Sequence, residues 1–363
     1  MKATITEYYV ASALGRGKEE TLANYRLGTA PGMNQISGDI LGRTVFFGSV
    51  LGELPVIAES KWNTRTNRLI ELALKNLDFA RLIGRYGTDR VGVVIGASNT
   101  GIHEAQDFVD RWIESGRDLP PEGFDFSMIE LGTPSLYLRD RIGAKGPAYT
   151  ISTACSSSAK AFGAARRLIE KGLCDAVVTG GVDGRCRFAL NGFHALGALS
   201  EGRCRPLADD RDGINLGEGV ALFAMEKSAA SADVVKFIGI GESSDAYHAT
   251  APDPEGTGAE TSMRGALHDA GLVPADVDYV NLHGTGTQAN DAMEMKAFHR
   301  VFDALEKPPR FESTKSLTGH CLGAAGAVEA AIAAILIEAG MAKTALSNSF
   351  AFGGSNASII LSA

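Results

Sequence analysis

The sequence predicts an α/β fold made of two halves, and three observations support this prediction. Short apolar runs closed by glycine alternate with helix-like stretches along most of the chain. The order strand, turn, helix, strand occurs around Thr150 and again around Val280. The chain has 363 residues, which is more than a single hydrophobic core usually organises.

The first half contains three apolar runs that are typical of buried strands. They cover residues 90–96, 148–153 and 175–179. Residues 156–171 have a helical composition, and Gly172 ends that helix. Because the runs lack polar alternation, we expect largely parallel strands with both faces covered.

The second half repeats this order. A strand is expected at residues 278–282, then a Gly/Thr turn, a helix to about residue 305, a second helix at about 325–339 and a final strand at 357–361. The polar, Ala/Ser-rich junction at residues 226–233 separates the halves. The expected division is therefore 1–228 and 229–363.

Composition excludes several classes of protein. The chain has 43 acidic and 35 basic residues, a net charge of −8 and no Lys/Arg-rich run, which argues against general nucleic-acid binding. No signal-peptide core is seen, and Glu329 and Glu338 interrupt the most membrane-like stretch, so no membrane association is expected. Five scattered cysteines predict neither a disulfide framework nor a zinc site and favour a reducing cytoplasm.

Cys155 is the first candidate for chemistry. It lies between an expected strand and an expected helix, surrounded by Ala and Ser. Free N–H groups and the helix dipole favour a thiolate at such a position. The alternative, a buried structural cysteine, applies equally to Cys174, Cys186, Cys204 and Cys321, none of which lies at such a junction.

Three segments of the second half supply further candidates. His283 ends a strand and precedes a turn with two glycines, at the sheet edge where α/β proteins build sites. Lys315 and His320 come together before a small-residue helix. The third segment, residues 348–356, is a turn too rich in glycine for an ordinary strand.

Together these groups suit acyl-transfer chemistry. A thiolate can accept an acyl group, two neutral imidazoles can donate hydrogen bonds to a thioester oxygen, and a glycine-rich turn offers backbone N–H donors. The motifs that carry these groups occur in the following order: TACSS at 153–157, RP at 205–206, RDG at 211–213, SSDAYH at 243–248, HGTGT at 283–287, STK at 313–315, GH at 319–320 and FGG at 352–354.

With this ordered set of motifs, the chain resembles the β-ketoacyl-ACP synthases of the elongating, Cys-His-His type. The resemblance extends from about Val91 to the C-terminal end of the sequence. It implies the thiolase-like fold: two similar α/β halves in five layers, αβαβα. It also implies decarboxylative condensation of an acyl chain with malonyl-ACP, no metal, no resident cofactor and a phosphopantetheine arm that arrives on the acyl carrier protein. A homodimer is implied, with a heterodimer of related synthases as the other possibility.

The resemblance also assigns roles. Cys155 corresponds to the nucleophile, His283 and His320 to the pair that promotes decarboxylation, and Lys315 to a buried lysine that orients them. Cys155 and Phe352 would supply oxyanion-hole N–H groups, with the Phe352 ring as a gate. Asp291 and Glu294 correspond to supporting acids, and Thr285 and Thr287 to pantetheine contacts.

An acidic synthase needs a local basic patch to bind an acidic carrier protein. The candidates for this patch are Lys61, Arg65, Arg68, Arg203 and Arg205.

Two features depart from the family pattern. The first ~90 residues match only loosely, and residues 339–346 connect helix to strand without the longer insert of typical members. Residues 181–183 and 191–193 are more typical of specialised polyene-type synthases.

Three alternatives remain. A thiolase would need a second cysteine at residues 350–358, where there is none. An initiating synthase would use Cys-His-Asn, which Lys315 with His320 fits less well. A chain-length partner subunit would lack the nucleophile.

Overall fold

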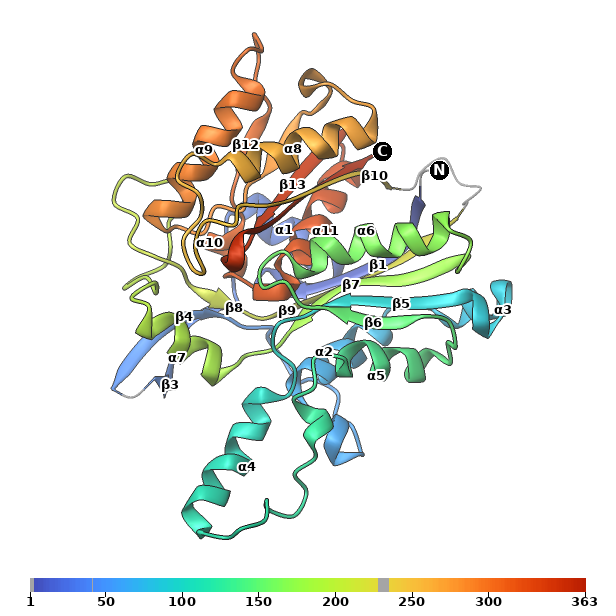
Figure 1. Cartoon of the computed structure of the whole chain (residues 1–363), viewed down its shortest axis with the longest axis vertical. Coiled ribbons are helices and arrows are strands. Elements are labelled where there is room, and N and C mark those ends of the chain that lie inside the picture. Colours follow the sequence, from blue (N-terminus) through green and yellow to red (C-terminus); the bar gives the residue numbers. More distant parts are fainter. Residues whose placement is uncertain (1–2, 41, 228–234) are drawn as a thin grey trace.

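The computed structural model describes residues 3–40, 42–227 and 235–363 (Figure 1). The expected boundary between residues 228 and 229 lies outside the described residues. Within them, no helix is both long and apolar enough to cross a bilayer.

Ten strands form two sets of five with the same topology. The first set has the order β6-β5-β7-β9-β1 and the second has the order β12-β11-β13-β14-β10. In both, the first three strands are parallel and the last two run antiparallel to their neighbours. The strands are β1 (Ala3–Ser12), β5 (Val91–Gly96), β6 (Ala148–Ile151), β7 (Ala176–Asp183), β9 (Gly219–Glu226), β10 (Lys236–Ser244), β11 (Tyr279–Asn281), β12 (Arg310–Glu312), β13 (Thr344–Phe350) and β14 (Ser355–Ser362).

The two sets join where β1 pairs briefly with β10, at Ala3 opposite Phe237. The expectation of largely parallel strands is wrong for β9 and β1 in the first half and for β14 and β10 in the second half. In the second half the cause is local, because only residues 351–354 connect β13 to β14. A connection this short returns the chain antiparallel to the strand it leaves.

Helices cover both faces of each sheet and produce five layers (Figure 1). The central layer contains α6 (Ser157–Glu170) and α11 (Ala325–Glu338), whose side chains pack against strands of both halves. The outer layers are α2 (Arg65–Leu74), α3 (Ala80–Tyr86) and α5 (Thr133–Ile142) on one side and α8 (Thr257–Ala270) and α9 (Gln288–Phe302) on the other. The predicted α/β fold of two similar halves is confirmed.

The remaining elements decorate this frame. α4 (Ile102–Ser115) projects from the body (Figure 1), and α1 (Gly17–Leu27) lies against α11. A small sheet packs beside α7 (Arg187–Ala195) and contains β3 (Met33–Ile40), β4 (Arg43–Gly48) and β8 (Leu216–Gly217). The short elements are β2 (Gly15–Arg16), α10 (Lys315–Thr318), η1 (Ser60–Trp62), η2 (Thr88–Arg90), η3 (Phe126–Met128), η4 (Pro274–Asp276), η5 (Leu322–Ala324) and η6 (Phe352–Gly354).

One glycine places the start of α6 directly against the sheet. A Cβ atom on Gly96, at the end of β5, would lie 2.3 Å from the backbone of Ser158. No larger residue fits this approach, which brings the turn before α6 to the end of the strands.

Candidate active site

Cys155 lies in a strained turn between β6 and α6. The preceding residue, Ala154, has a φ of +50°, which L-residues rarely adopt. The Ser157 hydroxyl holds the turn, because it donates to the carbonyl of Ala154 at 2.6 Å and accepts the N–H of Thr153 at 2.9 Å. The thiol is therefore presented at the beginning of α6, as the sequence predicts.

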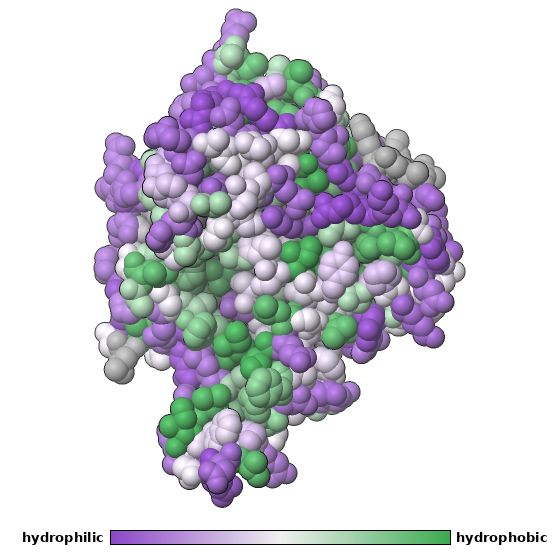
Figure 2. Space-filling view, in the orientation of Figure 1, coloured by the Kyte–Doolittle hydropathy of each residue, from purple (hydrophilic) through white to green (hydrophobic). Residues whose placement is uncertain are grey.

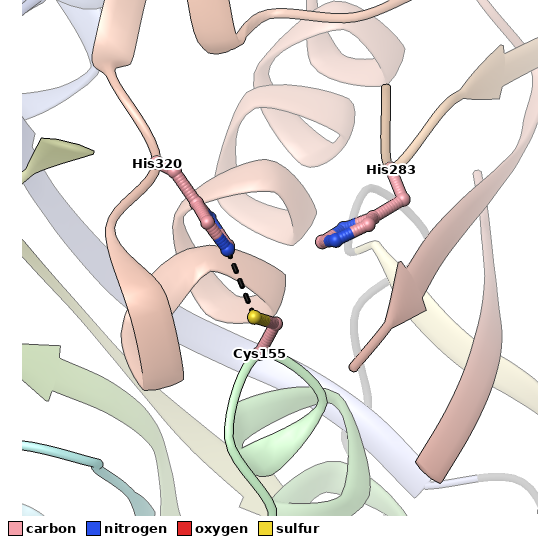
Figure 3. A group of neighbouring side chains, drawn as sticks. All are labelled: Cys155, His283 and His320. Carbon is pink, nitrogen blue, oxygen red and sulfur yellow. Dashed lines mark hydrogen bonds between the residues drawn. The ribbon is translucent and has the colours of Figure 1, made fainter. Parts of the chain in front are cut away.

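Two imidazoles from the other half face this thiol (Figure 3). Nε2 of His320 lies 2.9 Å from Sγ of Cys155. The rings of His283 and His320 are 5.3 Å apart at an angle of 80°, and one ligand-type atom from each of the three residues lies within 4.8 Å of the other two. All three residues are buried, so the structure brings together the predicted Cys-His-His set.

The backbone of His320 is fixed by β8. Its N–H donates to the carbonyl of Asn215 at 2.8 Å, and its carbonyl accepts the N–H of Gly217 at 2.9 Å. His283 follows β11, and its N–H donates to the Glu294 carboxylate at 2.8 Å. Both imidazoles thus come from backbone segments anchored on each side.

Lys315 links His283 to a residue that sequence reasoning missed. Its ammonium donates to the carbonyl of His283 at 2.5 Å, lies 3.4 Å from Nδ1 of the same residue and pairs with Glu329 at 2.5 Å. Lys315 and Glu329 are 0% and 2% exposed. The available signal for Glu329 was an acid in the middle of the apolar run that forms α11, because a buried charge requires a partner.

Burial determines the protonation of the three groups. It lowers the pKa of His283 and of His320 well below the usual range, and the Lys315 charge lowers both further. Burial also raises the pKa of Cys155 to about 11, although Lys315 and the backbone N–H groups of Phe352 and Cys155 oppose that rise. The backbone N–H groups thus favour the thiolate as the sequence-based argument expects, but burial outweighs them and favours a protonated thiol beside neutral imidazoles.

The backbone N–H groups of Cys155 and Phe352 both face Sγ. Phe352 begins η6, where Gly353 has a φ of +79° and donates its N–H to the carbonyl of Ala249 at 2.8 Å. The Phe352 ring is 38% exposed and stacks on Phe193 at 5.6 Å. Both rings line a cavity of about 370 Å³ that reaches Cys155, His283 and His320.

Family comparisons agree with this geometry. The β-ketoacyl synthase N-terminal domain matches residues 67–231, and the C-terminal domain matches residues 234–348. A 3-oxoacyl-[acyl-carrier-protein] synthase 2 from Coxiella burnetii is 32% identical in an alignment that covers 85% of this chain and 84% of that protein. The chain belongs to the β-ketoacyl synthase family.

Other relatives refine its place in the family. The Staphylococcus aureus 3-oxoacyl-[acyl-carrier-protein] synthase 2 is 36% identical over 69% of this chain, and this chain spans only 64% of that protein's length. A chain of the ketosynthase–chain length factor complex from Xenorhabdus doucetiae is 37% identical, with a TM-score of 0.93 over 99% of this chain and 98% of the other. A chain of the ishigamide ketosynthase/chain length factor is 27% identical with a TM-score of 0.88. The fold is therefore the thiolase-like fold of ketosynthases, and the Xenorhabdus doucetiae chain matches this chain over nearly the whole length of both.

The two acids Asp291 and Glu294 hold backbone N–H groups rather than Lys315. Glu294 accepts the N–H groups of His283 and Gly284, and burial raises its pKa to about 7. Asp291 accepts the N–H groups of Leu207 and Gly286 and lies 3.5 Å from Arg211. Neither acid is the partner of Lys315, whose ammonium pairs with Glu329 instead.

Thr285 and Thr287 line the cavity, and their role as pantetheine contacts remains a prediction. Their hydroxyls lie 2.9 Å apart, and Thr287 also accepts the N–H of Asn290 at the start of α9. One function of Thr287 is thus to cap a helix.

The five basic candidates for docking are not equivalent. Arg65 donates two hydrogen bonds to the fully buried Glu218, and Arg68 donates to the carbonyls of Leu54 and Pro55. We therefore withdraw these two from the docking patch, because internal contacts occupy their guanidinium groups. The other three candidates lie at the surface. Lys61 and Arg205 have exposed side chains, and the exposed Arg203 donates to the carbonyl of Ser316, so these three remain predictions.

Proposed function

We propose that this chain is a β-ketoacyl-[acyl-carrier-protein] synthase that extends an acyl chain by two carbons. One observation supports this proposal above all others. The thiol of Cys155 lies 2.9 Å from the His320 imidazole and faces two backbone N–H groups, at a cavity that His283 also lines. This arrangement provides a nucleophile, hydrogen-bond donors for an enolate and an oxyanion hole.

The first step is acyl transfer. Sγ of Cys155 attacks the carbonyl carbon of the acyl thioester, and the N–H groups of Cys155 and Phe352 stabilise the oxyanion. The bond from carbon to pantetheine sulfur then breaks, and the thiol proton passes by way of His320 Nε2 to the leaving sulfur. The raised pKa of Cys155 makes this proton transfer part of the barrier, since the thiol is protonated at rest.

The second step is condensation. The malonyl group loses CO₂, and its bonding electron pair becomes an enolate whose oxygen accepts hydrogen bonds from His283 and His320. The enolate carbon attacks the acyl carbonyl, the bond from that carbon to Sγ breaks, and Cys155 leaves as a thiolate that takes up one proton from solvent water. Depressed pKa values keep both imidazoles neutral, and a neutral imidazole N–H can donate without cancelling the enolate charge.

Intact-mass measurement tests the acyl-transfer step. A panel of acyl-ACPs offered to the protein should add one acyl mass, and peptide mapping should place it on Cys155. Cys155→Ala should abolish transfer, whereas Cys155→Gln should keep or increase malonyl decarboxylation. Full condensation by Cys155→Ala would overturn the mechanism.

The two rival functions have weaker support. A chain-length partner subunit would not need the nucleophile, yet Cys155 is present and faces His320. A thiolase would need a second reactive cysteine near η6, and residues 350–358 contain none.

We further propose two kinds of macromolecular partner. One is the acyl carrier protein, which delivers both substrates. The other is a second thiolase-fold subunit of the chain length factor kind, as in the relatives solved with such a subunit. Apolar side chains gather on the projecting arm that contains α4 (Figure 2), among them Ile113, Leu119 and Phe126, each at least 69% exposed. Patches of this kind are typical of interfaces.

Native mass spectrometry distinguishes the assemblies. A monomer alone that pairs after co-expression with a chain length factor-like protein supports the heterodimer. A stable dimer of this chain alone supports the homodimer instead. The strong similarity to a ketosynthase–chain length factor complex favours a specialised pathway, and the five free cysteines favour a reducing, cytoplasmic compartment.

A further inference from the structure

A buried polar chain crosses the second half behind His283. It begins at Glu294 on α9, passes through Asn348 on β13 and Ser358 on β14, and ends at Ser262 on α8. Each of these four side chains is 0% exposed. Polar groups at such depth require partners, so their arrangement is constrained.

Asn348 is the centre of this chain. Its Nδ2 donates to Oε1 of Glu294 at 3.1 Å, and its Oδ1 accepts the Ser358 hydroxyl at 2.7 Å. The Ser358 hydroxyl in turn lies 2.9 Å from the Ser262 hydroxyl. The Glu294 carboxylate fixes which end of the amide faces it, because a flipped amide would place Oδ1 of Asn348 against a carboxylate oxygen, two acceptors against each other.

Glu294 passes this constraint to the catalytic turn. Its Oε1 accepts the His283 N–H at 2.8 Å, and its Oε2 accepts the Gly284 N–H at 2.7 Å. On the other side of the same residue, Lys315 donates to the His283 carbonyl at 2.5 Å. The backbone of His283 is thus held between a carboxylate and an ammonium.

The same strand leads to the oxyanion hole. Asn348 lies two residues before Phe350, which ends β13 and packs its ring 6.1 Å from the ring of His283. The next turn carries the Phe352 N–H that faces Cys155. Asn348 therefore connects the segment that carries one imidazole with the segment that carries one oxyanion donor.

We infer that Asn348 is a positioning residue for decarboxylation: by its hydrogen bond to Glu294 it fixes His283 relative to the Phe352 amide. This inference rests on the proposed function, because it assigns His283 the malonyl step. Removal of the amide would leave Glu294 with two donors in place of three. A buried carboxylate that loses a donor recruits water or shifts, and the His283 turn shifts with it.

Asn348→Ala tests the inference in the Cys155→Gln background, where decarboxylation is measured without condensation. We expect kcat for malonyl-ACP to fall about tenfold with KM unchanged, which corresponds to about 1.4 kcal/mol. The matched control is Ser347→Ala. Ser347 is a buried neighbour on β13 whose hydroxyl has no hydrogen-bond partner among the described residues. This control should remain within twofold of the parent.

Asn348→Asp provides a readout that packing alone would not change. A protonated carboxyl at this position can donate to Glu294, but an ionised one repels it, so the deficit relative to the parent should grow from pH 6 to pH 8.5. Asp291, also on α9, raises the pKa of Glu294 further. Because Asp291 is present in both the parent and Asn348→Asp, its effect cancels when the kcat of the variant is divided by that of the parent. Asn348→Ser should fall between Asn348→Ala and the parent.

Three results would overturn the inference: parental kcat in Asn348→Ala, equal losses in Asn348→Ala and Ser347→Ala, or a pH-independent ratio for Asn348→Asp. Acylation of Cys155 in the otherwise unchanged protein reports separately on the proposed function. Absence of that adduct would reject the synthase function, whereas a normal adduct with unaffected Asn348 variants would reject only the role of Asn348.

Discussion

Lys315 and Glu329 form an ion pair of 2.5 Å in a part of the core where neither side chain is more than 2% exposed. Glu329 comes from the central helix α11, and Lys315 also donates to the carbonyl of His283. The pair thus connects the interior of the fold to one imidazole of the site. Its burial makes it costly to break and its position makes it electrostatically important.

Breaking the pair should strongly destabilise the protein. Glu329→Leu leaves the Lys315 ammonium uncompensated in the core, and we expect the free energy of unfolding to fall by about 3–5 kcal/mol. The double variant Lys315→Met/Glu329→Leu should recover most of that stability and remain inactive. Denaturant unfolding measures both, and a double variant no more stable than the single one would contradict this account.

The same pair should adjust the reactivity of Cys155 in opposite directions. The Lys315 charge lowers the pKa of Cys155, and the Glu329 charge raises it. Lys315→Met should therefore slow alkylation of Cys155 by iodoacetamide at pH 8, and Glu329→Gln should accelerate it. Peptide mapping restricts the measurement to Cys155, and circular dichroism must show that both variants are folded.

The pH profile of alkylation in the unmodified protein follows from the pKa of about 11. Only the thiolate reacts, so the rate should rise about tenfold per pH unit from pH 7 to pH 10. An ordinary thiol would level off near pH 8.5. A plateau below pH 9 would show that the site stabilises the thiolate more than its burial opposes it.

Ala154 stores strain beside the nucleophile. Its φ of +50° disfavours any L-residue by about 1–2 kcal/mol. Ala154→Gly should therefore leave the free energy of unfolding unchanged or raise it by up to about 1 kcal/mol, after the entropy that glycine adds to the unfolded chain. The same exchange at Ala161, inside α6, should lower it by about 1 kcal/mol. Equal effects at the two positions would argue against strain.

Charge reversal separates structural from docking arginines. Arg65→Glu places a second carboxylate beside the buried Glu218, so thermal unfolding should occur at a markedly lower temperature. Arg203→Glu, which loses one bond to the carbonyl of Ser316, should instead raise KM for the carrier protein without slowing decarboxylation at saturation. An unchanged KM in Arg203→Glu would remove it from the docking patch.

Three residues that the sequence selected, Cys155, His283 and His320, lie together in the structure, and a local sequence pattern marks each of them. Cys155 and His283 end strands, and His320 lies in a distinctive motif, so local pattern was enough to select them. Glu329 was missed as a partner because its contact with Lys315 depends on how α11 passes behind the turn. The raised pKa of Cys155 was not predicted, because the helix N-terminus is visible in the sequence, whereas the depth of burial is not.

The fold likewise has features that the sequence predicted and features that it did not. Alternation of apolar runs and helices predicted two α/β halves, and the structure has them. The antiparallel direction of β9 and β14 was not predicted, since an apolar run gives no direction. Arg65 was misassigned for a related reason: a basic residue at a helix start gives no indication that a buried acid, Glu218, faces it.

The origin of the site in both halves has a consequence for synthesis of the protein. The ribosome makes Cys155 with the first half, but the two imidazoles and the Phe352 amide come only with the second. During translation the Cys155 thiol therefore exists before the two imidazoles and the Phe352 amide that surround it in the folded protein. The complete Cys-His-His site therefore forms late in translation, after α11 has packed against α6 and β13 has packed against α11.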